Sequence, residues 1–165
     1  MNSIDYAKAL AQHLISKKWK LALAESCTGG LVCATLTELP GSSDWFERGY
    51  ITYSNAAKAE CLGVPAALIQ QHGAVSEAVA KAMAEGALQY AKVNVAISIT
   101  GIAGPTGGST EKPVGTVCFG WVIQNAAGEN VTSCQTKLFS GDRQTVRQQA
   151  SDYALAELLK LLSKQ

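Results

Sequence analysis

The stretch that decides the fold is Val93–Thr100, whose sequence is VNVAISIT. Valine and isoleucine at alternate positions are typical of a β-strand, and this is the clearest strand of the chain. A loop over Gly101–Pro113 follows it and holds four glycines and two prolines. Ser76 is a suitable N-cap for a helix over Glu77–Ala91 that leads into the strand. Together these segments predict a helix, a strand and a long glycine-rich loop in that order.

The same kind of pattern extends from this stretch toward both ends of the chain. Lys20–Glu25 is predicted to be a strand, and the turn Ser26–Gly30 leads from it into a helix over Leu31–Leu39. The other elements follow from caps, turn residues and apolar spacing. They are a first helix capped by Ser3, a strand over 46–54, helices over 55–62 and 65–72, a hairpin of strands over 114–123 and 131–139, and a last helix over 143–162.

Helices that alternate with strands indicate an α/β protein. The order of elements predicts a three-layer α/β/α sandwich on a mixed, mostly parallel sheet with one antiparallel hairpin. The length of 165 residues fits one domain over residues 1–165. A domain of this size buries enough apolar surface to fold without disulfides or metal.

Composition excludes several classes of protein. Lysine and arginine number 14 and aspartate and glutamate 13, so the net charge is +1 and no nucleic-acid partner is expected. The five cysteines form no C-x-x-C pair, which argues against a disulfide framework and against a zinc site. No apolar run approaches the ~18 residues of a membrane span, and the N-terminus lacks a signal-peptide pattern. We expect a cytoplasmic protein without a membrane partner, and a thinly charged surface (16% charged residues) favours a homo-oligomer.

Two loops that follow strands are the candidate sites, because ligands of open α/β sheets bind beyond the carboxyl ends of the strands. The turn Ser26–Gly30 opens a helix, so its N–H groups are expected to be unpaired and to face a ligand. The loop Gly101–Gly108 offers close backbone approach. Neither loop contains a Walker, dinucleotide-binding or G-x-S-x-G motif. On spacing alone, a tight turn without function explains each loop equally well.

A serine in this turn needs a base, and histidine is a poor candidate. Only His13 and His72 exist, at helical positions where histidine is usually structural or solvated. A desolvated lysine can serve instead, because burial lowers its pKa. Lys58 lies one turn into the helix after Tyr53 and has small apolar neighbours. A solvated surface lysine remains the ordinary alternative, and Cys27 is the rival nucleophile because a helix N-terminus acidifies a thiol.

Five motifs in one order resemble the CinA C-terminal domain family, over about residues 5–160. They are Ala24–Gly30 (AESCTGG), Phe46–Lys58 (FERGYITYSNAAK), His72–Glu77 (HGAVSE), Ser98–Pro105 (SITGIAGP) and Lys112–Val117 (KPVGTV). The chain is similar to the stand-alone form of the family, since it leaves no room for the molybdopterin-binding-like domain that precedes this domain in longer members. The resemblance implies the three-layer sandwich and a tendency to form oligomers.

The resemblance also implies nicotinamide-nucleotide amidohydrolase activity, in which nicotinamide mononucleotide (NMN) and water give nicotinate mononucleotide and ammonia in pyridine nucleotide recycling. The family is described as using a serine–lysine pair, and Ser26 and Lys58 match it. Tyr53 and Thr100 match further positions of the family's site. No cofactor and no metal is expected. The alternative is a catalytically inactive CinA-like module that binds a nucleotide in the same loops.

The remaining site residues are assigned by chemistry. Backbone N–H groups near Thr28, Gly29 and Gly30 are expected to stabilise an oxyanion. Arg143, with Arg147 as second candidate, is expected to bind the substrate phosphate through its fork of donors. The loop that contains Gly101 and Gly104 is expected to pack against the ribose or the pyridinium ring.

Overall fold

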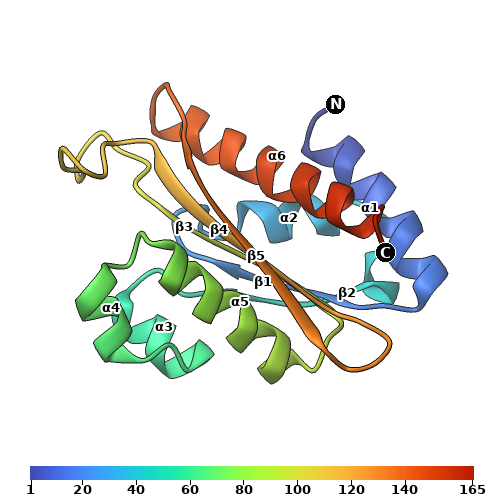
Figure 1. The fold of residues 1–165 in the computed structure, drawn as a ribbon. Coiled ribbons are helices and arrows are strands. Elements are labelled where there is room, and N and C mark those ends of the chain that lie inside the picture. The colour runs from blue at the N-terminus through green and yellow to red at the C-terminus, as the bar shows by residue number, and fades with distance from the viewer.

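The computed structural model describes all residues 1–165 and shows an α/β fold with one five-stranded mixed sheet and six α-helices (Figure 1). The strands lie in the order β2-β1-β3-β4-β5. Their bounds are β1 Leu21–Glu25, β2 Phe46–Ile51, β3 Val95–Gly101, β4 Thr116–Gln124 and β5 Asn130–Leu138. The helices are α1 Ser3–Lys17, α2 Leu31–Thr37, α3 Asn55–Leu62, α4 Ala66–His72, α5 Glu77–Ala91 and α6 Arg143–Leu162, with a short 3₁₀ helix over Ser42–Asp44.

Strand pairing corrects one expectation. β1 pairs in parallel with β2 and with β3, whereas β4 is antiparallel both to β3 and to β5. The pairs are therefore evenly divided, and the sheet is not mostly parallel. The reason lies in the connection between β3 and β4, which contains no helix. Without a helical crossover the chain returns beside β3 in the opposite direction.

Helices cover both faces of the sheet: α1, α2 and α6 lie on one face, and α3, α4 and α5 on the other (Figure 1). Alternate residues of β1 point to the two faces, so Leu21 and Leu23 join one buried cluster and Ala22 and Ala24 the other. The small alanines allow α5 to pack closely over β1, β3 and β4. None of the helices combines the length and apolar character that a membrane crossing requires.

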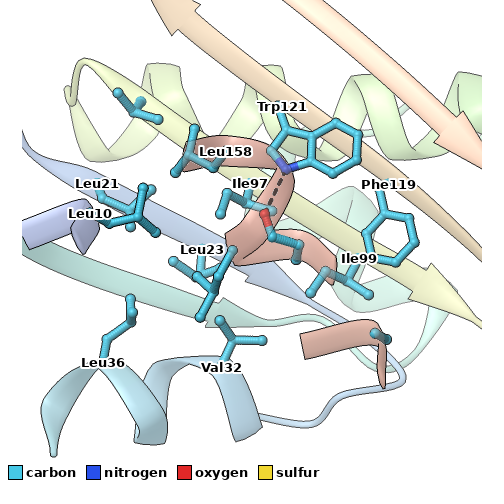
Figure 2. Close-up of a cluster of buried hydrophobic side chains, with 14 of the residues drawn as sticks. Leu10, Leu21, Leu23, Val32, Leu36, Ile97, Ile99, Phe119, Trp121 and Leu158 are labelled. Carbon is cyan, nitrogen blue, oxygen red and sulfur yellow. Dashed lines mark hydrogen bonds between the residues drawn. The ribbon is translucent and has the colours of Figure 1, made fainter. Parts of the chain in front are cut away.

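The larger cluster fixes the strands that carry the candidate site. Figure 2 shows β1 and β3 side chains such as Leu23 and Ile99 packed beside Val32 of α2 and Leu158 of α6. The indole N–H of Trp121 donates a 3.0 Å hydrogen bond to the carbonyl of Ala154, which ties β4 to α6. Burial of these side chains contributes roughly 1.5–3 kcal/mol each. The strand ends are thus held on a rigid base.

The predicted helices over 55–62, 77–91 and 143–162 are confirmed as α3, α5 and α6 with the same bounds. Ser76 caps α5 as expected, because its hydroxyl accepts a hydrogen bond from the N–H of Val79. The cap of α1 was assigned wrongly. Asn2 is the N-cap, through the N–H of Asp5, whereas Ser3 is buried and its hydroxyl contacts Ser151 of α6.

Candidate active site

The carboxyl ends of β1, β2 and β3 meet at one edge of the sheet, since these three strands are parallel and adjacent. A pocket of about 160 Å³ lies there. Its lining comes from the turn after β1, the segment after β2, the start of α3, the segment before α5, the end of β3 with the loop that follows it, and the first residue of α6. The lining residues are Ser26, Cys27, Tyr53, Asn55, Lys58, Ala74, Val75, Thr100, Gly101, Ala103 and Arg143.

Ser26 and Lys58 are in contact inside this pocket. Nζ of Lys58 lies 3.1 Å from Oγ of Ser26. Ser54 starts α3 by accepting a hydrogen bond from the N–H of Ala57, and this start directs the fourth helical residue, Lys58, back toward β1. The side chain of Lys58 is buried, with an exposed fraction of 1%. The interpretation as a solvated surface lysine is therefore wrong.

The surroundings of the Lys58 amine favour its neutral form. No carboxylate pairs with it, and its other two neighbours are the carbonyls of Thr52 at 3.0 Å and Tyr53 at 3.2 Å. Burial away from water lowers the pKa of Lys58 below its ordinary value of 10.5. A neutral amine has two N–H donors, which suffice for the two carbonyls, and one lone pair. That lone pair can accept the proton of the Ser26 hydroxyl.

Cys27 is not prepared to act as the nucleophile. Its thiol is buried, and burial raises its pKa to about 12, although Arg147 nearby works in the opposite direction. Acidification by the helix N-terminus was expected, but desolvation outweighs it at this position. At neutral pH the thiol stays protonated, and a thiol is a much weaker nucleophile than a thiolate.

The N–H groups at the start of α2 are paired, which corrects the expectation that they face a ligand. Glu25, the last residue of β1, is fully buried, and its carboxylate accepts hydrogen bonds from three of these groups. Oε1 accepts from Gly30 and Val32 at 3.1 Å each, and Oε2 accepts from Cys33 at 2.9 Å. Glu25 was not among the residues predicted for the site. The available signal was an acidic residue at the end of a buried strand, directly before the turn.

Tyr53 and Thr100 both line the pocket, but their side chains do not contact the Ser26–Lys58 pair. The contact of Tyr53 with Lys58 is made by its backbone carbonyl. Its phenol is 61% exposed and accepts a hydrogen bond from Arg143. The hydroxyl of Thr100 is buried and donates to the carbonyl of Ala74 at 2.9 Å. Thr100 thereby connects the end of β3 to the segment before α5.

Arg143 lies at the mouth of the pocket, at the N-terminus of α6. Its guanidinium donates to the carbonyl of Gly104 at 2.8 Å and to the phenol oxygen of Tyr53 at 3.1 Å. Gly101 is part of the pocket wall, and a Cβ there would come within 3.1 Å of the sulfur of Cys27. The end of β3 thus supplies Gly101 to the wall, and the loop after it supplies Gly104 to the rim.

Arg147 points into the turn after β1 and does not line the pocket. Its guanidinium donates to the carbonyl of Cys27 at 3.1 Å and to the carbonyl of Thr28 at 2.9 Å. The hydroxyl of Thr28 is buried without a hydrogen-bond partner. Gly29 adopts a left-handed conformation with φ +58°, which lets the turn reach α2. Arg147 and Glu25 hold this turn from two sides.

The fold and the buried serine–lysine pair define the class: an α/β protein with its site at the carboxyl ends of parallel strands. The sequence profile of the CinA C-terminal domain matches residues 4–162, and the chain belongs to this family.

Among the relatives of known sequence, the nicotinamide-nucleotide amidohydrolase PncC of Escherichia coli K12 is 51% identical over 94% of this chain and 92% of its own length. The protein of the same name from Enterobacter agglomerans is 52% identical over 89% of this chain and 87% of its own length. The CinA-like protein of Syntrophobacter fumaroxidans is 49% identical over 94% of this chain, which spans only 36% of that longer protein.

Solved structures of relatives share the whole fold. The crystal structure of competence damage-inducible protein A (ComA) from Klebsiella pneumoniae superposes with a TM-score of 0.92 at 37% identity and covers 99% of this chain and 98% of that chain. The competence-damaged protein (CinA) superfamily protein from Escherichia coli superposes with a TM-score of 0.89 at 39% identity, with coverage of 96% and 90%.

Proposed function

We propose that this protein is a nicotinamide-nucleotide amidohydrolase that converts NMN and water to nicotinate mononucleotide and ammonia, in recycling of pyridine nucleotides in the cytoplasm. Relatives named for this activity match nearly the whole chain at about half identity. The observation that carries the proposal is the buried amine of Lys58, 3.1 Å from the hydroxyl of Ser26 and free of any carboxylate. This arrangement fits a base beside a nucleophile.

In the proposed mechanism, Oγ of Ser26 attacks the carboxamide carbon of NMN while the neutral amine of Lys58 accepts the hydroxyl proton. The protonated amine then donates that proton to the departing nitrogen, and ammonia leaves as the C–N bond breaks. The nicotinoyl group remains on Ser26 as an ester. Water then attacks this ester while Lys58 accepts a proton from the water. Lys58 returns this proton to Oγ of Ser26 as the ester bond breaks, and nicotinate mononucleotide is released. The sequence of steps needs no metal and no cofactor.

The oxyanion of the tetrahedral intermediate needs N–H donors that are free in the folded protein. Gly29 donates to the carbonyl of Ser26, and Gly30 donates to Glu25, so these two expected donors are occupied. The N–H groups of Cys27 and Thr28 have no acceptor within the protein. We therefore assign the oxyanion to the N–H group of Cys27, which lines the pocket, whereas Thr28, the third expected donor, is fully buried and does not line it. Each such donor typically contributes about 3–4 kcal/mol to transition-state stabilisation.

The size of the pocket fits the orientation of the substrate. At about 160 Å³ it is smaller than the ~300–1,000 Å³ of sites that enclose a whole drug-sized ligand. It therefore holds the nicotinamide end, with the carboxamide at Ser26, while the ribose and phosphate extend outward. Arg143 at the rim is exposed and is the cationic group in position to meet the phosphate. The exposed phenol of Tyr53 lies beside it.

A binding module without catalysis is the alternative from another class. In that case Lys58 would be a countercharge that faces the ligand phosphate. Its burial, its three contacts with Ser26, Thr52 and Tyr53, and its lowered pKa favour the catalytic interpretation instead.

Release of ammonia from NMN is the direct test. The purified protein is incubated with NMN in the presence of a chelator, and ammonia and nicotinate mononucleotide are quantified together. We expect the two products in equal amounts, and much slower turnover of nicotinamide and of nicotinamide riboside, which lack the phosphate. Binding of NMN without ammonia release would contradict the proposed activity and support the binding module.

A further inference from the structure

Glu25 is a fully buried carboxylate that the proposed chemistry does not use. It precedes Ser26 directly, at the end of β1, with an exposed fraction of 0%. No lysine or arginine neutralises it, because the ion pairs of the protein are Arg48–Glu47 and Lys160–Glu157. A buried charge without a cationic partner is costly unless hydrogen-bond donors surround it. The donors here are three backbone N–H groups at the start of α2, and the thiol of Cys33 lies beside the carboxylate as well.

These hydrogen bonds close a ring through the turn that carries Ser26. The side chain of Glu25 binds the N–H of Gly30, the N-cap residue of α2, and the next two bonds reach Val32 and Cys33 in the first turn of that helix. No other side chain caps α2. The carboxylate also lies at the positive end of the helix dipole, which stabilises its charge. Glu25 thus joins the end of β1 to the start of α2, and the turn that carries Ser26 is held between these two elements.

The backbone of Glu25 reaches the base as well. Its carbonyl accepts a 2.8 Å hydrogen bond from the N–H of Thr52, and the carbonyl of Thr52 is one of the two that hold the amine of Lys58. On the other side, the N–H of Ser26 donates to the carbonyl of Ile99 in β3. Glu25 thus connects the nucleophile on one side and the support of the base on the other.

We propose that Glu25 is a positioning residue for the reaction: its carboxylate fixes the turn Ser26–Gly30 so that the hydroxyl of Ser26 stays within hydrogen-bond distance of Lys58. This inference rests on the proposed function. It goes beyond an ordinary helix cap, because a cap stabilises the helix alone, whereas this one encloses the nucleophile. Loss of its acceptors would displace Ser26, and a misplacement of ~1 Å can cost ~100-fold in rate.

The test compares Glu25→Gln with a matched control. Glutamine keeps the size but loses the charge, and its NH₂ group cannot accept a hydrogen bond from an N–H of α2. Asp5→Asn makes the same chemical change in the capping box at the N-terminus of α1. Four quantities are measured for each variant: kcat and KM for NMN, the pH profile of kcat/KM, the rate of Ser26 labelling by a fluorophosphonate, and Tm.

For Glu25→Gln we expect kcat and the labelling rate to fall together by about 10- to 100-fold. KM should stay within about twofold, and the midpoint of the acidic limb of the pH profile should not move, because Glu25 does not bind substrate or contact the Lys58 amine. Asp5→Asn should lower Tm and leave kcat and the labelling rate unchanged, since an ordinary helix cap contributes to stability alone.

A folded Glu25→Gln protein with the kcat and labelling rate of the wild type would overturn the proposal. If Glu25→Gln does not fold, Glu25→Asp carries the same measurements: it keeps the charge, but its side chain is too short for all three hydrogen bonds, and a wild-type kcat in this variant would overturn the proposal equally. A wild-type protein that is labelled at Ser26 without hydrolysing NMN contradicts the proposed function alone, and the labelling rates still test Glu25. A wild-type protein without labelling at Ser26 contradicts both.

Discussion

The two connections Ser26–Gly30, after β1, and Gly101–Pro113, after β3, are both rich in glycine but differ in how their polar groups are used. In the first, distant elements bind the backbone: Glu25 takes N–H groups, and Arg147 of α6 takes two carbonyls. In the second, residues 105–111 are exposed. Ser109 and Lys112 there bind one another locally through the backbone and the Ser109 hydroxyl.

We call the turn Ser26–Gly30 the fixed centre and the connection Gly101–Pro113, with Arg143 beside it, the rim of the pocket. The first connection holds Ser26, the proposed nucleophile, in a buried turn that Glu25 and Arg147 fix from two sides. The second contributes its opening residues Gly101 and Ala103 to the pocket wall and the carbonyl of Gly104 to Arg143. Its residues 105–111 are exposed to solvent, and the amine of Lys112 donates to the carbonyl of His72. Changes at the fixed centre should therefore act on kcat, and changes at the rim on KM or on stability.

Removal of Ser26, the proposed nucleophile, should have the largest effect. Ser26→Ala deletes the hydroxyl and should lower kcat by roughly 10⁴-fold or more, as loss of a serine nucleophile does in other hydrolases. The fold should persist, because this hydroxyl contacts only Lys58 and, at 3.5 Å, the carbonyl of Tyr53. Ammonia release and Tm are measured together. A folded variant with near-normal turnover would remove Ser26 from the mechanism.

Removal of Lys58, the proposed base, should have the second largest effect. Lys58→Met keeps the length of the side chain and should lower kcat by roughly 10²–10⁴-fold, the usual contribution of a general base. In the wild type, kcat/KM should rise with pH as the Lys58 amine loses its proton, and this acidic limb should lie below 10.5 because burial lowers the pKa. A pH profile without such a limb would contradict a lysine base.

The same pKa gives a prediction for stability. The lowered pKa of Lys58 means that the unfolded chain binds more protons than the folded chain between the folded-state pKa and the ordinary value of 10.5. The free energy of unfolding of the wild type relative to Lys58→Met should therefore increase as pH rises through that window. Denaturant unfolding at several pH values measures it, and a constant or falling difference would contradict a desolvated amine.

Much of the fold was predictable because its signals are local. The bounds of α5 and α6 follow from Ser76 and Asp142, whose side chains cap them, and from the apolar spacing behind. Sheet order and the direction of β4 were less accessible. The direction of β4, for example, depends on how residues 102–115 bring the chain back beside β3. Tertiary contacts determine this path, and the residues of the loop do not encode it on their own.

The candidate site was likewise predictable only in part. The motifs around Ser26 and Lys58 indicated both residues, and the structure places them in contact. The partners of other side chains were not predictable, because each lies far away in sequence: the hydroxyl of Thr100 binds Ala74, and Arg147 reaches Cys27. Spacing along the chain cannot choose among the many acceptors that such side chains meet in the fold.

Arg143 and Arg147, one turn apart on α6, allow the rim and the fixed centre to be compared by single substitutions. Arg143→Ala should raise KM for NMN by about 10- to 100-fold with a small change in kcat, because a hydrogen bond to a charged group contributes ~1.5–3 kcal/mol. Arg147→Ala should instead lower kcat, since its guanidinium holds the carbonyls of the turn.

Steady-state kinetics over a range of NMN concentrations separates the two arginine effects, and Arg48→Ala on the exposed edge of β2 serves as the control. If KM is unchanged when Arg143 and Arg147 are both removed, neither binds the phosphate.

A pair of glycine variants compares the two connections directly. Gly29 and Gly107 have φ values of +58° and +79°, so alanine at either position costs roughly 1 kcal/mol of stability. Only Gly29→Ala should also lower kcat, by a few-fold, because it strains the turn of Ser26. Gly107→Ala should lower Tm and leave kcat unchanged. Equal kcat values in the two variants would show that the turn tolerates strain and would weaken the distinction.

The smallest effect is expected from a change of the Cys27 side chain, because the proposed mechanism uses the backbone N–H of Cys27 and not its thiol. Its thiol is buried with a pKa raised to about 12, so at neutral pH it provides almost no thiolate. Cys27→Ser should keep kcat within about twofold, since serine is close in size, and the wild type should resist inactivation by iodoacetamide at pH 7. Loss of activity in Cys27→Ser, with the protein folded and Ser26 present, would make the thiol the nucleophile and reverse the assignment of the two neighbouring residues.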